Sequence, residues 1–226
     1  MDTRASDATI GGRARRIGAA LLGSAWAAFL LPPQSVAWSG VDAPGWIRTL
    51  SFWPVYDQIK VVMLRFGTTD VYMVFGTAAS LSFLLIGLAL YAPLRRTRRI
   101  LATLLAWAVL AGAPITFLSY LNHDTTAPLR FMWGWEGLLL TAIGVLATIL
   151  AFALGGRSGW PLWLRIMLGS TPVLIVLSVF VLSYWPHGPL VVLGIEAALI
   201  AAYAPDQRTP APRIHLPQNA HSRAAN

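Results

Sequence analysis

The chain of 226 residues contains no cysteine and a single lysine. The missing cysteines exclude disulfides, thiol catalysis, iron–sulfur ligation and cysteine-based zinc sites. The lysine, Lys60, lies outside every long apolar run, so a Schiff-base lysine inside a helical bundle is excluded too. Gly-rich phosphate loops, GxSxG elbows and HExxH strings are also missing. We therefore expect no cofactor and no metal site.

Charged residues are scarce, at 12% of the chain against about 25% in soluble domains. Apolar runs fill most of the remainder, and a helix of about 20 such residues crosses the hydrocarbon of a bilayer. The sequence therefore predicts an all-α, polytopic membrane helical bundle with about six transmembrane helices. The expected spans are residues 17–33, 71–93, 100–121, 135–155, 164–185 and 189–204. Residues 1–16 would form a cytoplasmic arm, and residues 205–226 a disordered cytoplasmic tail.

The basic residues favour one orientation of these spans. With the N-terminus inside, the inner segments hold 13 Lys and Arg residues and the outer segments hold 4. Positive charge is retained on the cytoplasmic side of short loops. We therefore expect a multi-pass protein of the cell membrane with both termini in the cytoplasm. The net charge of +8 is explained by this asymmetry, so no nucleic-acid partner is expected.

The first run, Ile17–Leu31, has two interpretations. It is short for a span and is followed by Pro32 and Pro33, which are expected to end a helix. Basic residues before it and small residues after it also match a cleaved signal peptide. We favour a retained signal anchor over cleavage.

The segment after this run predicts a short amphipathic helix in the outer membrane interface. Apolar residues between Val55 and Phe66 recur on one helical face. Pro54 suits the first helical position, Gly67 the C-terminal cap, and Asp70 the N-cap of the next span. The alternative interpretation is a lid over a cavity of the bundle.

Glu196 is the main candidate for chemistry, because it lies in the middle of the last apolar run. An ionisable residue at this depth is expected to be buried and hydrogen-bonded to a neighbouring span. Ser82 and Ser178 lie at similar depth and are the expected partners. The residue serves either as a structural hydrogen bond or as a buried acid.

Further candidate catalytic residues lie near the outer surface: His123 and Asp124 in a loop, and Glu136 at the start of the fourth span. Asp70 and His187 share this rim. Glu136 ends the string Trp133-Gly134-Trp135-Glu136. This string and a second buried acid resemble membrane-bound terpene cyclases over two or three residues. The resemblance implies that carboxylic acids, here Glu136 and Glu196, protonate an isoprenoid.

Three functions follow from these observations. The first is a non-catalytic accessory or assembly component of the membrane, favoured because catalytic motifs are missing. The second is an intramembrane enzyme that uses Glu196 and Glu136 for acid catalysis on a lipid or isoprenoid. The third is a small transporter, although such proteins usually carry repeats and several intramembrane charges. The expected partners are the lipid bilayer and either a membrane protein or an apolar, lipid-like ligand.

Overall fold

The computed structural model describes residues 3–97, 100–155, 158–182 and 186–205. All regular structure in these ranges is helical, as the apolar runs predict. The elements are α1 (Thr3–Ser39), the short 3₁₀ helix η1 (Gly40–Asp42), α2 (Gly45–Ser51), α3 (Pro54–Arg65), α4 (Val71–Arg96), α5 (Ile100–Leu121), α6 (Met132–Ala153), α7 (Leu162–Leu182) and α8 (His187–Tyr203). The expected tail falls almost wholly outside the described residues.

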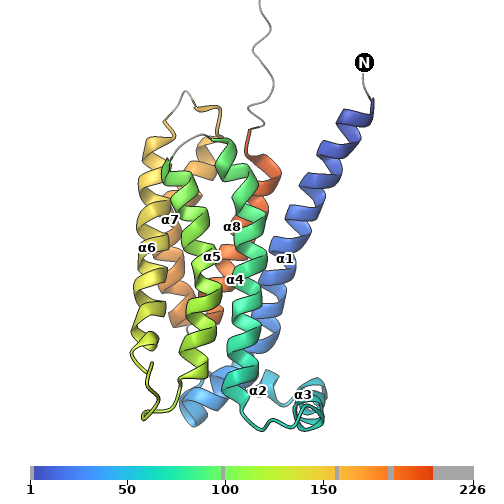
Figure 1. Ribbon diagram of the computed structural model, residues 1–226, viewed down its shortest axis with the longest axis vertical. Helices are drawn as coiled ribbons and strands as arrows, with labels where there is room; N and C mark the ends of the chain where they lie inside the picture. The colour runs from blue at the N-terminus through green and yellow to red at the C-terminus, as the bar shows by residue number, and fades with distance from the viewer. Residues whose placement is uncertain (1–2, 98–99, 156–157, 183–185, 206–226) are drawn as a thin grey trace, which may run out of the picture.

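Five of these helices are long and apolar enough to cross a membrane: α1, α4, α5, α6 and α7. The sixth, α8, is equally apolar and has 17 residues, which is the lower limit for a span. It lies alongside the other helices in the bundle (Figure 1). The last five helices agree with their predicted ranges to within a few residues.

The expectation that Pro32 and Pro33 end the first helix was wrong. Helix α1 begins at Thr3 and continues through both prolines to Ser39. Its apolar part, Gly11–Ala37, includes the predicted span. A proline inside a helix removes one backbone hydrogen bond, because it has no N–H to donate to the carbonyl four residues earlier. Pro33 therefore frees the carbonyl of Phe29. The Tyr56 hydroxyl donates to this oxygen over 2.7 Å, so the group that the proline leaves unpaired is satisfied from another helix.

The bundle is built by close approaches between antiparallel neighbours. Helix α1 packs along α8 and α4, and α4 packs most extensively against α5. At Gly194 of α8, an added Cβ would lie 2.9 Å from the carbonyl oxygen of Ala20 on α1. Ser24 donates across the same contact to the carbonyl of Val191 over 2.8 Å. Small residues are typical of such contacts, because they let two membrane helices approach closely.

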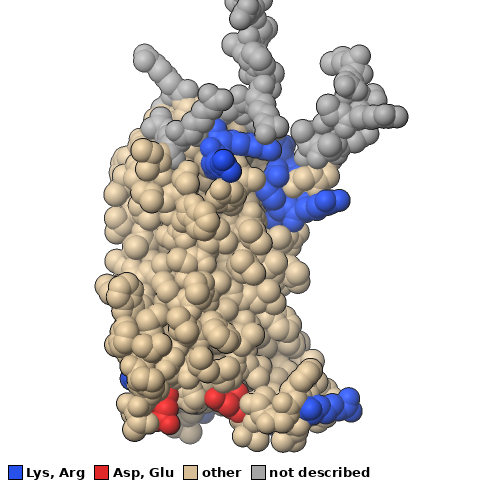
Figure 2. Space-filling model, in the orientation of Figure 1, with Lys and Arg blue, Asp and Glu red and all other residues tan. Residues whose placement is uncertain are grey.

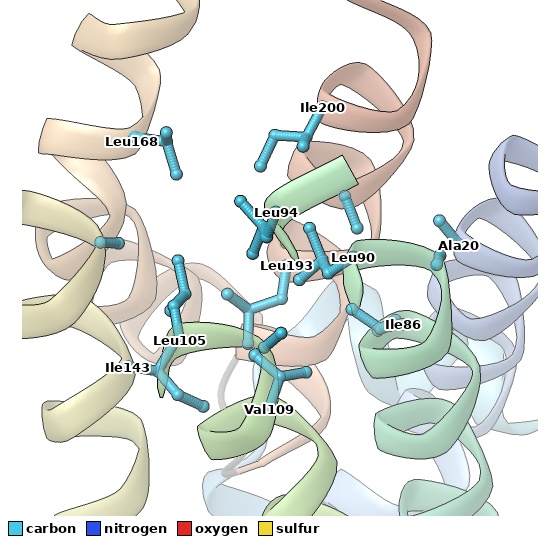
Figure 3. Packing of buried hydrophobic residues seen from close by; sticks show 14 of the residues in the cluster. Ala20, Ile86, Leu90, Leu94, Leu105, Val109, Ile143, Leu168, Leu193 and Ile200 are labelled. Atoms are coloured by element: carbon cyan, nitrogen blue, oxygen red, sulfur yellow. The ribbon is translucent and has the colours of Figure 1, made fainter. Parts of the chain in front are cut away.

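The apolar core occupies the space between these helices. Figure 3 shows Leu90 and Leu94 of α4, Leu105 of α5, Leu168 of α7 and Leu193 of α8 converging there. The core joins every spanning helix, α1 included, since Ala20 and Ala27 of α1 belong to it. Helix α1 is thus an integral part of the packed bundle.

The amphipathic helix is confirmed. Helix α3 starts at Pro54, ends at Arg65, and is followed by Gly67 with a φ of 69°. The Asp70 side chain caps α4 by accepting hydrogen bonds from the N–H groups of Tyr72 and Met73, at 2.9 and 3.2 Å. Figure 1 shows α3 projecting sideways from the end of the bundle where α1 finishes.

Two side chains attach α3 to the bundle, Tyr56 in its first turns and Met63 near its end. The Tyr56 ring packs on the Phe29 ring with centroids 5.2 Å apart, and its hydroxyl makes the bond described above. Burial raises the pKa of Tyr56, which keeps the phenol protonated as a donor.

The two ends of the bundle differ in charge. Figure 2 shows Lys and Arg side chains gathered at the end where α1 begins, and Asp and Glu side chains at the opposite end. A second basic patch appears in Figure 2 at the projecting end of the molecule, where α3 carries Lys60 and Arg65. The start of α1 and the end of α8 lie at the same end of the bundle (Figure 1).

We predict that Tyr56→Phe weakens the attachment of α3 to α1. The change keeps the ring contact but leaves the Phe29 carbonyl without a donor, which costs about 1–3 kcal/mol for a buried group. The substitution should cost less in a Pro33→Ala background, because the alanine introduced there supplies an N–H to the same carbonyl. Unfolding of the two single variants, the double variant and the wild type in detergent measures this coupling. Equal costs in both backgrounds would contradict the proposed role of the hydrogen bond.

Candidate functional site

Glu196 lies in the middle of α8 with 5% of its surface exposed. The Thr171 hydroxyl of α7 donates to both carboxyl oxygens, at 3.2 and 3.1 Å. The expectation that Glu196 is buried and hydrogen-bonded to a neighbouring span is confirmed. The expected partners were wrong: the Ser178 hydroxyl donates to the Ile175 carbonyl within its own helix, and the Ser82 hydroxyl has no hydrogen-bond partner among the described residues.

Thr171 is held in place by the packing of α7 against α6. The next residue, Pro172, lies against Gly144 of α6, where an added Cβ would be 3.0 Å from the proline Cβ. Thr148 of α6 also donates to the carbonyl of Gly169 over 3.2 Å. Thr171 itself is fully buried. Its hydroxyl points toward α8, where it donates to the Glu196 carboxyl.

The space next to Glu196 is very small. A cavity of about 10 Å³ touches its side chain. Apart from Glu196 and Thr171, its lining is apolar and includes Leu105, Ile143 and Leu193, which are labelled in Figure 3. A single water needs about 10–15 Å³. The site can therefore hold about one water molecule and no organic substrate.

This geometry determines what Glu196 can do in the described structure. Its carboxyl group reaches a hydroxyl and little else, so it can hold α7 and α8 together. Hydrogen bonds between membrane helices contribute about 0.6 kcal/mol on average and at most about 2 kcal/mol. Proton transfer to a substrate would require a reacting atom within hydrogen-bond distance of the carboxyl, and the packed apolar residues occupy that space.

Glu136 lies one turn into α6 and is also buried, with 5% of its surface exposed. The hydroxyls of Thr116 and Ser119 on α5 lie beside its carboxyl group. Its Oε1 atom nevertheless forms no hydrogen bond of ordinary geometry with the residues that the structure describes. The contacts of Glu136 are with α5 and those of Glu196 with α7, so the two acids do not form one site.

His123 and Asp124 lie in the loop between α5 and α6. His123 Nδ1 is 2.9 Å from the Tyr120 carbonyl oxygen and 3.9 Å from the Asp70 carboxylate, and the imidazole stacks on Tyr72. Arg130 donates to the His123 carbonyl over 2.8 Å. Through these contacts, His123 packs the loop against the start of α4 and the end of α5.

Asp124 is exposed, and its carboxylate accepts a 3.5 Å hydrogen bond from the adjacent Thr125 hydroxyl. His187, expected at the rim, is fully buried at the start of α8. No group of three or more potential metal-binding His, Asp or Glu side chains occurs within the described ranges. The structure therefore brings the side chains of Asp70 and His123 together. The Asp124 carboxylate contacts Thr125 instead, Glu136 lies against α5, and Glu196 contacts α7.

A groove of about 710 Å³ lies between α1, α3 and α4. Trp26 and Phe29 line it from α1, Ile59 and Val62 from α3, and Met73 on α4. The apolar periodicity of residues 55–66 predicted the helix that covers this groove. The sequence did not predict the groove itself, because its depth depends on how α3 is attached to α1.

No protein-family model matches the chain, and neither a curated protein nor a solved structure shows significant similarity to it.

We predict that Glu196→Gln leaves the free energy of unfolding nearly unchanged, since the amide oxygen can still accept from Thr171. Glu196→Ala should lower it by about 1–3 kcal/mol, because it removes the bond and enlarges the cavity. Thr171→Val is the matched control that removes the same bond from the other side. If Thr171→Val has no effect, or if its effect simply adds to that of Glu196→Ala, the structural role of the bond is refuted.

Proposed function

We propose that this multi-pass membrane protein is a non-catalytic accessory or assembly component of the cell membrane. The observation that carries this proposal is the packing around Glu196. Glu196, in the middle of the last apolar helix, accepts hydrogen bonds from Thr171 and has a cavity of only about 10 Å³ beside it. A tightly packed interior favours a protein that acts through its outer surface.

An enzyme that acts on a lipid or isoprenoid would need a pocket that reaches a catalytic acid. The groove beneath α3 has the volume for such a ligand, but neither Glu196 nor Glu136 lines it. The carboxyls and the apolar space thus lie in different parts of the molecule. This separation weighs against acid catalysis.

A transporter would need polar or ionisable groups along a path through the bundle. The small cavity beside Glu196 is lined by one other polar side chain, Thr171, and its remaining lining residues are apolar. This supports a structural role for the carboxyl over a place in an ion pathway.

The outer surface of the spans fits contact with lipid or with a membrane partner. Large apolar side chains are exposed on α5, α6 and α7, among them Trp107, Phe152 and Phe180 at 56%, 79% and 78%. The basic end of the bundle, where α1 begins, would face the cytoplasm. The α2–α3 segment would then lie at the outer surface.

Purification in native lipid particles, with mass spectrometry of protein and lipid, tests the proposed role. We expect a membrane protein to co-purify in a fixed ratio with both the wild type and Glu196→Gln. In vesicles made from native lipid extract, both forms should leave the lipid composition unchanged. A lipid product that forms with the wild type and not with Glu196→Gln would establish an enzyme instead.

The orientation is tested by single cysteines, since the chain has none of its own. We expect Lys60→Cys on α3 to react with an impermeant maleimide in intact cells. Ser158→Cys, from the loop between α6 and α7 at the opposite end, should react only after lysis. The reverse pattern would show that the basic end of the bundle faces outward.

A further inference from the structure

We propose that the groove between α1, α3 and α4 holds an acyl chain of a bilayer phospholipid, and that Gln58 binds the ester region of that lipid at the mouth of the groove. The inference goes beyond the accessory role and relies on it only for the placement of the bundle in a membrane. It assigns a specific lipid position to a segment that the sequence predicts as an interfacial helix or, alternatively, as a lid.

The lining of the groove matches a hydrocarbon chain. All of its lining residues are apolar except Gln58, Thr68 and Thr77. The two threonine hydroxyls are already engaged, because Thr77 donates to the Met73 carbonyl over 2.8 Å and Thr68 accepts from the Asp70 N–H over 3.1 Å. The remaining lining is apolar, so the groove suits a hydrocarbon chain better than ordered water.

Gln58 has a different position from the two threonines. It lines the groove from α3 together with Val55, Ile59 and Val62, its side chain is exposed, and its amide is the largest polar group of the lining. A primary amide offers both a donor and an acceptor. It can therefore bind the ester carbonyls that join the chains of a phospholipid to its headgroup, while the chain continues into the groove.

The depth of the groove in the membrane also fits this lipid. Phe52, Trp53 and Phe66 flank α3 with exposed fractions of 83%, 59% and 82%. Exposed aromatic rings settle at the level of the headgroups. The groove then opens from α3 toward the hydrocarbon along Met73, Thr77 and Leu81 of α4. An ester group at Gln58 and a chain along α4 follow the natural direction of a lipid.

A flexible chain fits the groove better than a second helix does. Contacts between membrane helices are rich in small residues that allow close approach, whereas Trp26, Phe29 and Met63 project into this space. The volume of about 710 Å³ lies within the range of ligand pockets. The bilayer is itself apolar, so the preference for the groove must come from packing and from Gln58. We therefore expect enrichment of roughly three- to tenfold over other lipid positions.

The test uses a phosphatidylcholine that carries a diazirine in the middle of one acyl chain. The purified protein is reconstituted into vesicles of this lipid and dioleoylphosphatidylcholine, and cross-linked residues are mapped by peptide mass spectrometry. Labelling at Met73 and Thr77 should exceed labelling at Val176 and Phe180, which are 53% and 78% exposed on α7. Equal labelling of the groove and the α7 positions would overturn the proposal.

Variants locate the effect. Thr77→Trp fills the groove and should remove the excess labelling at Met73, while Val176→Trp on α7 should leave it unchanged. Gln58→Leu, at an exposed position, should reduce the excess labelling at Met73 and leave labelling of α7 intact.

If the groove is instead covered by a second copy of the chain, cross-linked dimers will form and lipid labelling at Met73 will be absent, which refutes the proposal. Loss of labelling on α7 as well would show that the protein is not inserted in the membrane, a failure distinct from that of the groove.

Discussion

One hydrogen bond, from the Tyr56 hydroxyl to the Phe29 carbonyl, connects the interfacial helix α3 to the spanning helix α1. In hydrocarbon, a spanning segment must pair its own peptide groups, because no water is present to do so. Pro33 breaks that rule at Phe29, and the Tyr56 hydroxyl restores it from α3. The same bond fixes α3 beside α1, and the position of α3 creates the groove. A local defect in α1 thus determines where an otherwise surface-bound helix lies.

The interior of the bundle follows a different principle. Small residues bring α1 against α8, and Gly144 brings α6 against Pro172 of α7. The resulting packing leaves Glu196 a single polar partner and almost no free volume. Burial of the carboxyl is tolerable because Thr171 meets it, in keeping with the rule that polar groups inside membranes pair with one another. The polar group therefore specifies how α7 and α8 face each other.

Much of the fold could be predicted from the sequence, because its signals are local. Apolar length placed α4 to α8, and Pro54, Gly67 and Asp70 placed the ends of α3 and the cap of α4. Features that depend on two distant segments were not predictable in this way. The carbonyl that Pro33 frees in α1 is paired by Tyr56 from α3, and the partner of Glu196 depends on the rotation of α7 about its axis. The expected depth in the membrane indicated Ser82 or Ser178 as the hydrogen-bond partner of Glu196, whereas the partner in the structure is Thr171.

Glu136 and Glu196 therefore lie outside the groove, and this separation bears on function. A catalytic site requires polar groups, a cavity and access to converge. Here Glu136 and Glu196 are buried in packed helix contacts, and neither of them lines the groove between α1, α3 and α4. The groove and the exposed aromatic rings beside it lie together on the flank formed by α1, α3 and α4. The proposed lipid would bind on this flank, where α3 lies over the contact between α1 and α4.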